Sequence, residues 1–290
     1  VKELNKASGM WSMKSQFSAR NNNTWPDGTI SFGEVDYLVV AGGGGGGGDK
    51  GGGGGAGGVL ASYCTPTSPI NIDSTTYSVV IGDGGTGRNK NPCTAGSSGL
   101  PSSFASLTAI GGGRGGSSTC YQASPGGSGG GGGNGNSPTC GGSATCGQGN
   151  AGGNVFCSGG GGGGGAGGTA SNSPHGGFGG IGISNNITSF GGYWGGGGGG
   201  ARGQGGIGGL GGGGTSGNDN YPGQSGFANT GGGGAGAVMV SSPSPATAYA
   251  GDVISGVLYV RAPGAQTKGL AVSGCGNILT GICTPAGVSE

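Results

Sequence analysis

The chain reads VDYLVVA at residues 35–41 and continues at once into seven consecutive glycines at residues 42–48. The first part is rich in β-branched and aromatic residues, which predicts a short β-strand over residues 35–40. Each ordered glycine loses more conformational entropy on folding than any other residue, so an ordered run implies that the absence of side chains is needed there. The junction therefore predicts a fold in which short strands lead into glycine segments that pack through their backbones.

Glycine supplies 89 of the 290 residues, against an average usage of about 7%. Seven consecutive glycines break the Gly-X-Y repeat of collagen, so a collagen triple helix is excluded. Glycine segments can instead form polyproline II helices, which have no internal hydrogen bonds and so leave each N–H free to bond a neighbouring helix. Further glycine runs that could each supply one such rod lie at residues 51–55, 129–133, 159–165, 195–200 and 211–214.

Charge and aromatic content favour an ordered chain over a flexible, disordered tract. Only 7% of the residues are charged, the formal net charge is +1, and the chain holds 3 Trp, 8 Tyr and 7 Phe residues. Disordered tails usually combine high net charge with few aromatic residues. The scattered basic residues also argue against nucleic-acid binding, which needs clustered Lys and Arg. No apolar stretch reaches the ~18 residues of a membrane span, so membrane insertion is not expected.

Composition divides the chain into three regions, residues 1–33, 34–236 and 237–290, of which only the middle one is rich in glycine. We predict a mainly β, irregular fold of short strands and packed polyproline-II-like glycine rods. Besides residues 35–40, strands are expected at residues 77–81, closed by a turn at residues 82–85, at residues 104–110 and, more weakly, at residues 187–190.

The two flanking regions have ordinary composition. Met10, Met13 and Phe17 recur at the spacing of one helix face, which predicts a short N-terminal helix. Residues 253–260 are rich in β-branched residues and predict a closing strand. The C-terminal region should therefore contribute a small β element.

The chain contains eight cysteines, an even number that suits four disulfides, although the pairing does not follow from the sequence. Free or mixed thiols are the alternative. A metal site is disfavoured, because the chain has no C-x-x-C pair and His175 is its only histidine. Cys275 and Cys283 bracket a short stretch that looks like a disulfide-closed loop in the tail. The disulfide candidates are Cys64, Cys93, Cys120, Cys140, Cys146, Cys157, Cys275 and Cys283.

Four landmarks follow one another along the chain: YLVVA before a glycine run at residues 37–41, YSVVIG at residues 77–82, SSF with TAIGGG within residues 102–113, and an apolar strand that ends in Val260-Arg261. This order resembles the glycine-rich domain of bacteriophage tail fibres and related bacterial surface proteins. The resemblance covers residues 34–262. It implies that these residues form one domain of strands and packed glycine segments.

The N-terminal region carries a second resemblance. Its sequence GMWSM at residues 9–13, followed by Gln16-Phe17 and Trp25-Pro26, is similar to a short segment of phage virion proteins that sits beside glycine-rich or fibre domains. The resemblance implies that residues 1–33 are an attachment or oligomerisation segment. The residues expected to carry this role are Trp11, Met13, Phe17 and Trp25.

Together these resemblances imply a structural virion protein, a phage tail-fibre or adhesin component that mediates attachment to the host surface. They imply an extracellular particle in which the chain contacts other virion proteins and a host cell-surface glycan or protein. A homotrimer fits, because trimeric fibres bury strand edges that one chain leaves open. The alternative is a purely structural capsid-decoration protein or extracellular filament subunit without receptor binding.

No enzymatic activity and no cofactor are expected. His175 lies in an expected loop, where nothing fixes the geometry of a Ser-His-Asp triad. The ten acidic residues are spread thinly, which disfavours a paired-carboxylate glycosidase. The many G-x-G-x-x-G matches lack the βαβ unit that a dinucleotide site needs.

Aromatic residues beside glycine runs are the candidate binding residues. Tyr193 and Trp194 lie between two glycine runs, where rigid segments on both sides would hold them in place for stacking on a sugar. The competing interpretation is that such residues cap the glycine segments as a small core. The candidate receptor-binding residues are Tyr193, Trp194, Tyr121, Phe178 and Tyr221.

Overall fold

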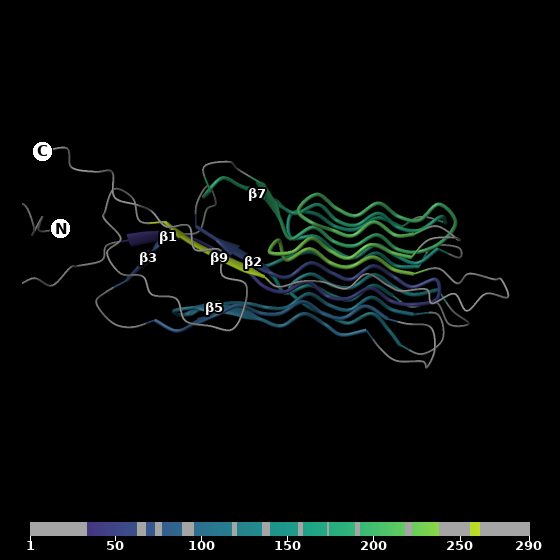
Figure 1. The fold of residues 1–290 in the computed structure, drawn as a ribbon, viewed down its shortest axis with the longest axis horizontal. Helices are drawn as coiled ribbons and strands as arrows, with labels where there is room; N and C mark the ends of the chain where they lie inside the picture. Colours follow the sequence, from purple (N-terminus) through teal and green to yellow (C-terminus); the bar gives the residue numbers. More distant parts are fainter. Residues whose placement is uncertain are drawn as a thin grey trace, which may run out of the picture.

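The computed structural model contains short strands that lead into long extended segments (Figure 1). No helix occurs within the described residues. The predicted N-terminal helix, the attachment residues Trp11, Met13, Phe17 and Trp25, and the Cys275–Cys283 tail all lie outside them. The structure describes residues 34–62, 68–72, 77–88, 96–117, 121–134, 140–155, 159–172, 174–188, 192–217, 222–237 and 256–261.

The largest sheet is built around strand β1 (Glu34–Val40), which confirms the strand expected before the first glycine run. β1 pairs antiparallel with β2 (Val59–Ala61), with β3 (Ile70–Asn71) and with β9 (Val257–Arg261). β9 is the predicted closing strand, and its register places Asp36 opposite Arg261. The C-terminal region therefore completes the sheet in which the glycine-rich region begins.

A hairpin replaces the single strand that was predicted over residues 104–110. Strands β5 (Ser102–Phe104) and β6 (Leu107–Ala109) pair antiparallel, and β4 (Val79–Val80) pairs with β5. The chain reverses at Ala105, whose φ of 51° is left-handed and uncommon for a residue with a side chain. The prediction was wrong here because the sequence contains no glycine or asparagine to mark the turn.

The weak strand predicted over residues 187–190 is wrong at residues 187–188, and residues 189–190 lie outside the described residues. Residues 187–188 form a bend, and the strands beside it are β7 (Ile183–Asn185) and β8 (Gly192–Trp194), which pair antiparallel. The amide of Ile187 donates to Oδ1 of Asn185, so the local turn is held by a side chain. Asparagine side chains favour this kind of turn over a continuing strand.

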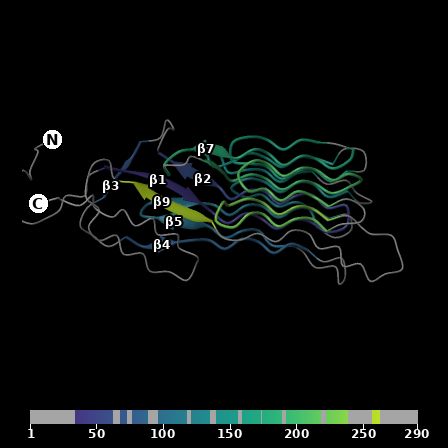
Figure 2. The same ribbon diagram turned by 45° about the horizontal axis from the view of Figure 1, so that its top comes forward.

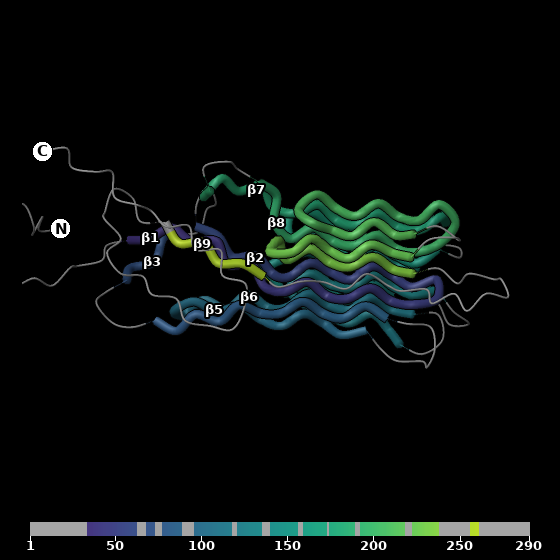
Figure 3. Tube along the Cα trace, viewed as in Figure 1, coloured from purple at the N-terminus to yellow at the C-terminus, as the bar shows by residue number. Residues whose placement is uncertain are grey.

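Beyond the strands, extended segments run back and forth and lie side by side, forming what we call the glycine bundle (Figures 2 and 3). Its central segment, residues 51–58, is bonded to other segments on all sides. Its amides donate to residues 110–116, 161–164 and 231–237, and its carbonyls accept from residues 41–47, 128–131 and 198–201. Every amide of this buried segment and nearly every carbonyl is therefore satisfied by neighbouring backbones, as burial requires.

In the first glycine run, glycines three residues apart face the same neighbouring segment. A Cβ added to any glycine of residues 42–47 would lie closer than 3.0 Å to the backbone of another segment. Glycine is therefore required by close packing. The pairs that share a neighbour are Gly42 and Gly45 facing residues 82–87, Gly43 and Gly46 facing residues 231–236, and Gly44 and Gly47 facing residues 112–116.

Two predictions about individual glycine stretches were wrong. Residues 82–85 form no turn but begin an extended segment, in which the amide of Gly85 donates to the carbonyl of Gly43. Conversely, the run at residues 211–214 is not one rod. The chain turns at residues 210–212, and Gly211 and Gly212 have φ values of 99° and 93°, which side chains rarely adopt.

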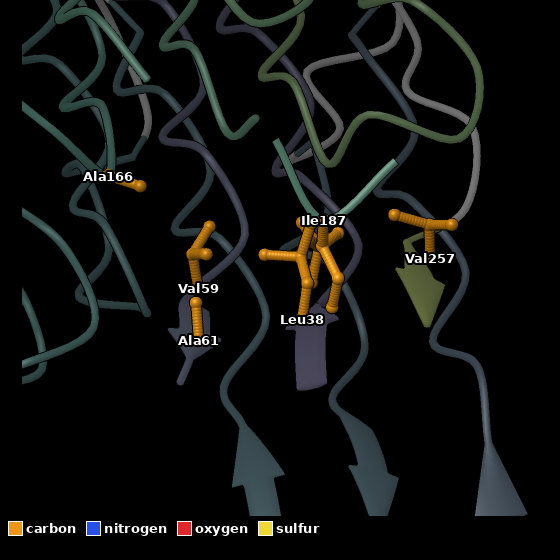
Figure 4. Close-up of a cluster of buried hydrophobic side chains, with 7 residues drawn as sticks. Leu38, Val59, Ala61, Ala166, Ile187 and Val257 are labelled. Atoms are coloured by element: carbon orange, nitrogen blue, oxygen red, sulfur yellow. The ribbon is translucent and has the colours of Figure 1, made fainter. Parts of the chain in front are cut away.

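Apolar side chains gather where the strands meet the bundle. Figure 4 shows one cluster, in which Leu38 of β1 packs among residues from β2, β9 and the bundle. Successive residues of β1 point to opposite faces, so Tyr37 and Val39 join a second cluster with Phe104. We call this part of the molecule the sheet end, and the opposite side, with the turns at residues 48–51 and 202–205, the outer end. The members of the first cluster are Leu38, Val40, Val59, Ala61, Ala166, Ile187 and Val257.

Candidate functional site

Tyr121 lies at the outer end, between segments that leave the sheet end at β4 and β6. The guanidinium of Arg88 lies 5.3 Å from the centroid of its ring, and that of Arg114 lies 5.8 Å from it. Both distances fall within the range of a cation–π interaction. Tyr121 remains 38% exposed, so the arginines hold the ring without covering it.

Arg88 is the buried member of this group, with 4% of its surface exposed. Its Nη1 donates a hydrogen bond to Oγ of Ser117. Loss of hydration lowers the pKa of Arg88 below its ordinary value, and electrostatic interactions with Tyr121 and Asp49 offset part of this effect. Arginine has so high an ordinary pKa that the side chain stays charged at neutral pH.

Arg114 is positioned through its backbone. Its amide donates to Oγ of Ser124, which fixes the segment that carries Tyr121 against the segment that carries Arg114. Carbonyl and amide bonds between Ser117 and Tyr121, and between Ser124 and Arg114, tie the same two segments together. Tyr121 therefore lies on a segment that is bonded to the segment of Arg114 through both backbone and side-chain groups.

Tyr193 and Trp194 point to different surroundings, although they are adjacent in β8. Tyr193 is 46% exposed. Trp194 packs against the cluster around Leu38, and its ring meets Tyr259 of β9 at 5.2 Å between centroids. Trp194 thus packs against the core while remaining partly exposed, and Tyr193 is the more exposed residue of the pair.

The remaining candidate residues lie apart from these two sites. Phe178 is 50% exposed on a segment that returns from the outer end, and Tyr221 lies outside the described residues. Tyr121 at the outer end and Tyr193 at the sheet end are separated by the length of the bundle. The structure therefore does not bring the described aromatic candidates, Tyr121, Phe178, Tyr193 and Trp194, together in one site.

Arg88 and Arg114 were not predicted as site residues. Each stands after or within a glycine-rich stretch, and their spacing in sequence gives no sign that both would face Tyr121. Their proximity arises because residues 81–88 and 110–117 both run outward from the hairpin sheet. Only knowledge of this path could have identified them.

Cys140 and Cys146 carry free thiols and are exposed, so the structure joins neither in a disulfide. The other cysteine candidates lie outside the described residues. Within the described ranges, no group of three or more His, Cys, Asp or Glu side chains could hold a metal ion. The same part of the chain has no helix of the length and hydrophobicity that a membrane crossing needs.

Comparison with known families gives a match to the family described as glycine-rich domain, over residues 18–263. The chain belongs to this family. No curated protein matches the chain. The family match extends from before β1 to just after β9, so the sheet and the glycine bundle together make up the glycine-rich domain.

Proposed function

We propose that this glycine-rich domain protein is a virion component, a phage tail-fibre or adhesin subunit that attaches the particle to the host surface. The observation that carries the proposal is the path of the chain. β1 and β9 pair at the sheet end, so the described chain enters and leaves on the same side. The turns at residues 48–51 and 202–205, and Tyr121 with its two arginines, lie at the opposite end. A particle held at the sheet end would present the outer end to the host.

The glycine segments are proposed to be polyproline II helices. The support is the three-residue repeat of neighbours along residues 42–47, because a polyproline II helix has three residues per turn. Packed in this way, the bundle is stiff, since no segment can move without breaking backbone hydrogen bonds to its neighbours. A stiff body lowers the entropic cost of binding through its end.

Tyr121 is the proposed contact for a host-surface glycan. A sugar ring can stack on an exposed aromatic face, and the adjacent guanidinium groups supply donors for its hydroxyl or acidic substituents. Other virion proteins are the proposed partners of the N-terminal segment, and a homotrimer is the proposed assembly. The proposed role involves no catalysis and no cofactor.

The test is adsorption of particles that carry Tyr121→Ala, compared with Tyr193→Ala as a control at the other end of the bundle. We expect Tyr121→Ala to reduce adsorption to host cells while the purified protein melts as the wild type does. Tyr193→Ala should leave adsorption unchanged. Normal adsorption by a folded Tyr121→Ala variant would overturn the role of this residue. Normal adsorption after exchange of all outer turns, with particles intact, would favour the purely structural alternative.

A further inference from the structure

Four large apolar side chains lie on the outside of two neighbouring bundle segments, residues 176–182 and 205–210. They are Phe178, Ile181, Ile207 and Leu210, and their exposed fractions are 50%, 51%, 62% and 60%. We call this surface the apolar face. Single exposed apolar residues are ordinary, but a contiguous group of them usually marks an interaction site.

Hydrogen bonds place the two segments side by side. The amide of Gly179 donates to the carbonyl of Ile207, and three residues later the amide of Gly182 donates to the carbonyl of Leu210. The segments are therefore parallel and in register. Phe178 lies one residue before the first of these bonds and Ile181 one residue before the second.

The intervening positions face inward. A Cβ on Gly179 would overlap the carbonyl of Gly197, and a Cβ on Gly209 would overlap that of Gly180. Gly206 and Gly208 are blocked in the same way by neighbouring segments. Two positions of every three are thus closed to side chains, and the third points outward. On the apolar face, this third position holds an apolar residue each time.

Several other outward positions of the bundle hold polar residues, although Leu100 and Phe227 are apolar and 55% and 66% exposed. Ser143, Asn154 and Gln224 are all exposed on further segments. Outward positions therefore do not require apolar side chains. The concentration of apolar side chains on residues 176–182 and 205–210 indicates that a partner covers them.

We propose that the apolar face is an interface between copies of this chain. It deepens the proposed homo-oligomer by naming its surface. Residues 176–182 and 205–210 contain no charged side chain, so a second copy meets no repulsion and a charged partner finds no complement. A sugar would require hydrogen-bonding groups, whereas three of these four side chains are aliphatic.

Size and spacing also suit a second copy. With about half of each side chain exposed, the four offer roughly 400 Å² of apolar surface, the size of patches that are often functional. The exposed glycine backbone around these side chains adds to the area that an interface could bury, so the total approaches the ~800 Å² per partner of a standard interface. A second copy carries the same three-residue spacing, so its side chains can fit between those of the first.

The experiment is sedimentation velocity of the purified full chain over a range of concentrations. We expect the wild type to form species larger than the 26.6 kDa monomer as concentration rises. The double variant Ile207→Ser, Leu210→Ser should weaken this association by about tenfold or more, because it removes apolar area from the interface. The matched control is Val80→Ser, Leu100→Ser, which alters two side chains that are 50% and 55% exposed on other segments.

Leu210→Lys serves as a second variant in case the double variant folds poorly. It places like charges on both copies and should weaken association more at low salt than at high salt. A wild type that stays monomeric at all concentrations, or folded variants that associate as the wild type does, would overturn the proposal. Sedimentation requires no host, so this outcome is separate from that of the adsorption test.

Discussion

Trp194 meets Tyr259 edge-on, with 5.2 Å between their ring centroids and 63° between their planes. Trp194 ends β8, which leads into the second half of the glycine bundle, and Tyr259 lies at the centre of the closing strand β9. Both rings pack against the cluster around Leu38. This contact ties the closing strand to a part of the bundle with which it forms no strand pairing.

The first prediction compares the two adjacent aromatic residues of β8. Trp194→Ala should lower the free energy of unfolding by about 2–3 kcal/mol, somewhat less than for a fully buried tryptophan, because a partly buried core contact is lost. Tyr193→Ala should change it by no more than about 0.5 kcal/mol, as expected for an exposed residue. Thermal and urea denaturation measure both. Equal effects of the two substitutions would contradict the assignment of Trp194 to the core.

The second prediction tests the requirement for glycine within one run. A Cβ at Gly46 would overlap the carbonyl of Ala235, whereas a Cβ at Gly48 would lie 3.4 Å from the side chain of Arg88 and 3.6 Å from its carbonyl oxygen. Gly46→Ala should therefore destabilise the protein by about 2 kcal/mol or more, as over-packing does. Gly48→Ala should change stability by less than about 1 kcal/mol. The melting temperatures of the two variants decide the point, and similar values would count against backbone packing of this run.

The third prediction concerns alkaline pH. Burial raises the pKa of Tyr259 above its ordinary value of 10.0, because the protein disfavours the phenolate. The contribution of the neutral side chain to stability is complete below pH 10 and is lost as the pH rises through the raised pKa, since the unfolded chain ionises first. Tyr259→Phe cannot ionise at this position, so the variant should lose less stability between pH 9 and pH 11, a window of roughly one unit either side of the ordinary pKa. Melting curves across this window, measured on both proteins, should diverge; parallel curves would refute the prediction.

The fourth prediction uses the amides of residues 161–164. Gly161 donates to the carbonyl of Gly132, Gly163 to that of Gly198, and Gly164 to that of Gly129. Amides bonded inside the bundle should exchange with solvent only when the domain opens, so their exchange should be slowed by several orders of magnitude. Hydrogen exchange followed by NMR, with the denatured chain as reference, measures this protection. Exchange at the denatured rate would mean that the run behaves as a flexible linker.

The strands at the two ends of the domain could be predicted from sequence, and so could β4, which lies within the expected residues 77–81, whereas β2, β3, β7 and β8 were not predicted. Residues 35–40 and the strand ending in Arg261 are rich in β-branched residues, and both strands are present as β1 and β9. Residues 104–110 resemble these two segments in their apolar content, but the chain turns at Ala105. Local propensity cannot reveal such a reversal, because the left-handed conformation at Ala105 is stabilised by pairing within the sheet.

The candidate site shows a similar division. The exposure of Tyr121, Phe178 and Tyr193 agrees with the expectation that aromatic residues beside glycine runs can face solvent. Nothing in the sequence separated Trp194 from Tyr193, since adjacent residues of a strand point to opposite faces and the sequence does not say which face is covered. The arginines beside Tyr121 come from segments that meet only through the path of the chain.

The sequence by itself determined that this protein has a backbone core. Runs such as residues 42–48 contain no side chains, so any ordered packing had to use amide and carbonyl groups of neighbouring segments. Only the tertiary structure decided which segments are neighbours, which of every three positions faces outward, and hence where Tyr121 and the apolar face lie. The physical reason is that a glycine has no side chain, so nothing in its local sequence indicates which segment it will pack against. Its environment is set by the turns and strands that direct each segment through the bundle.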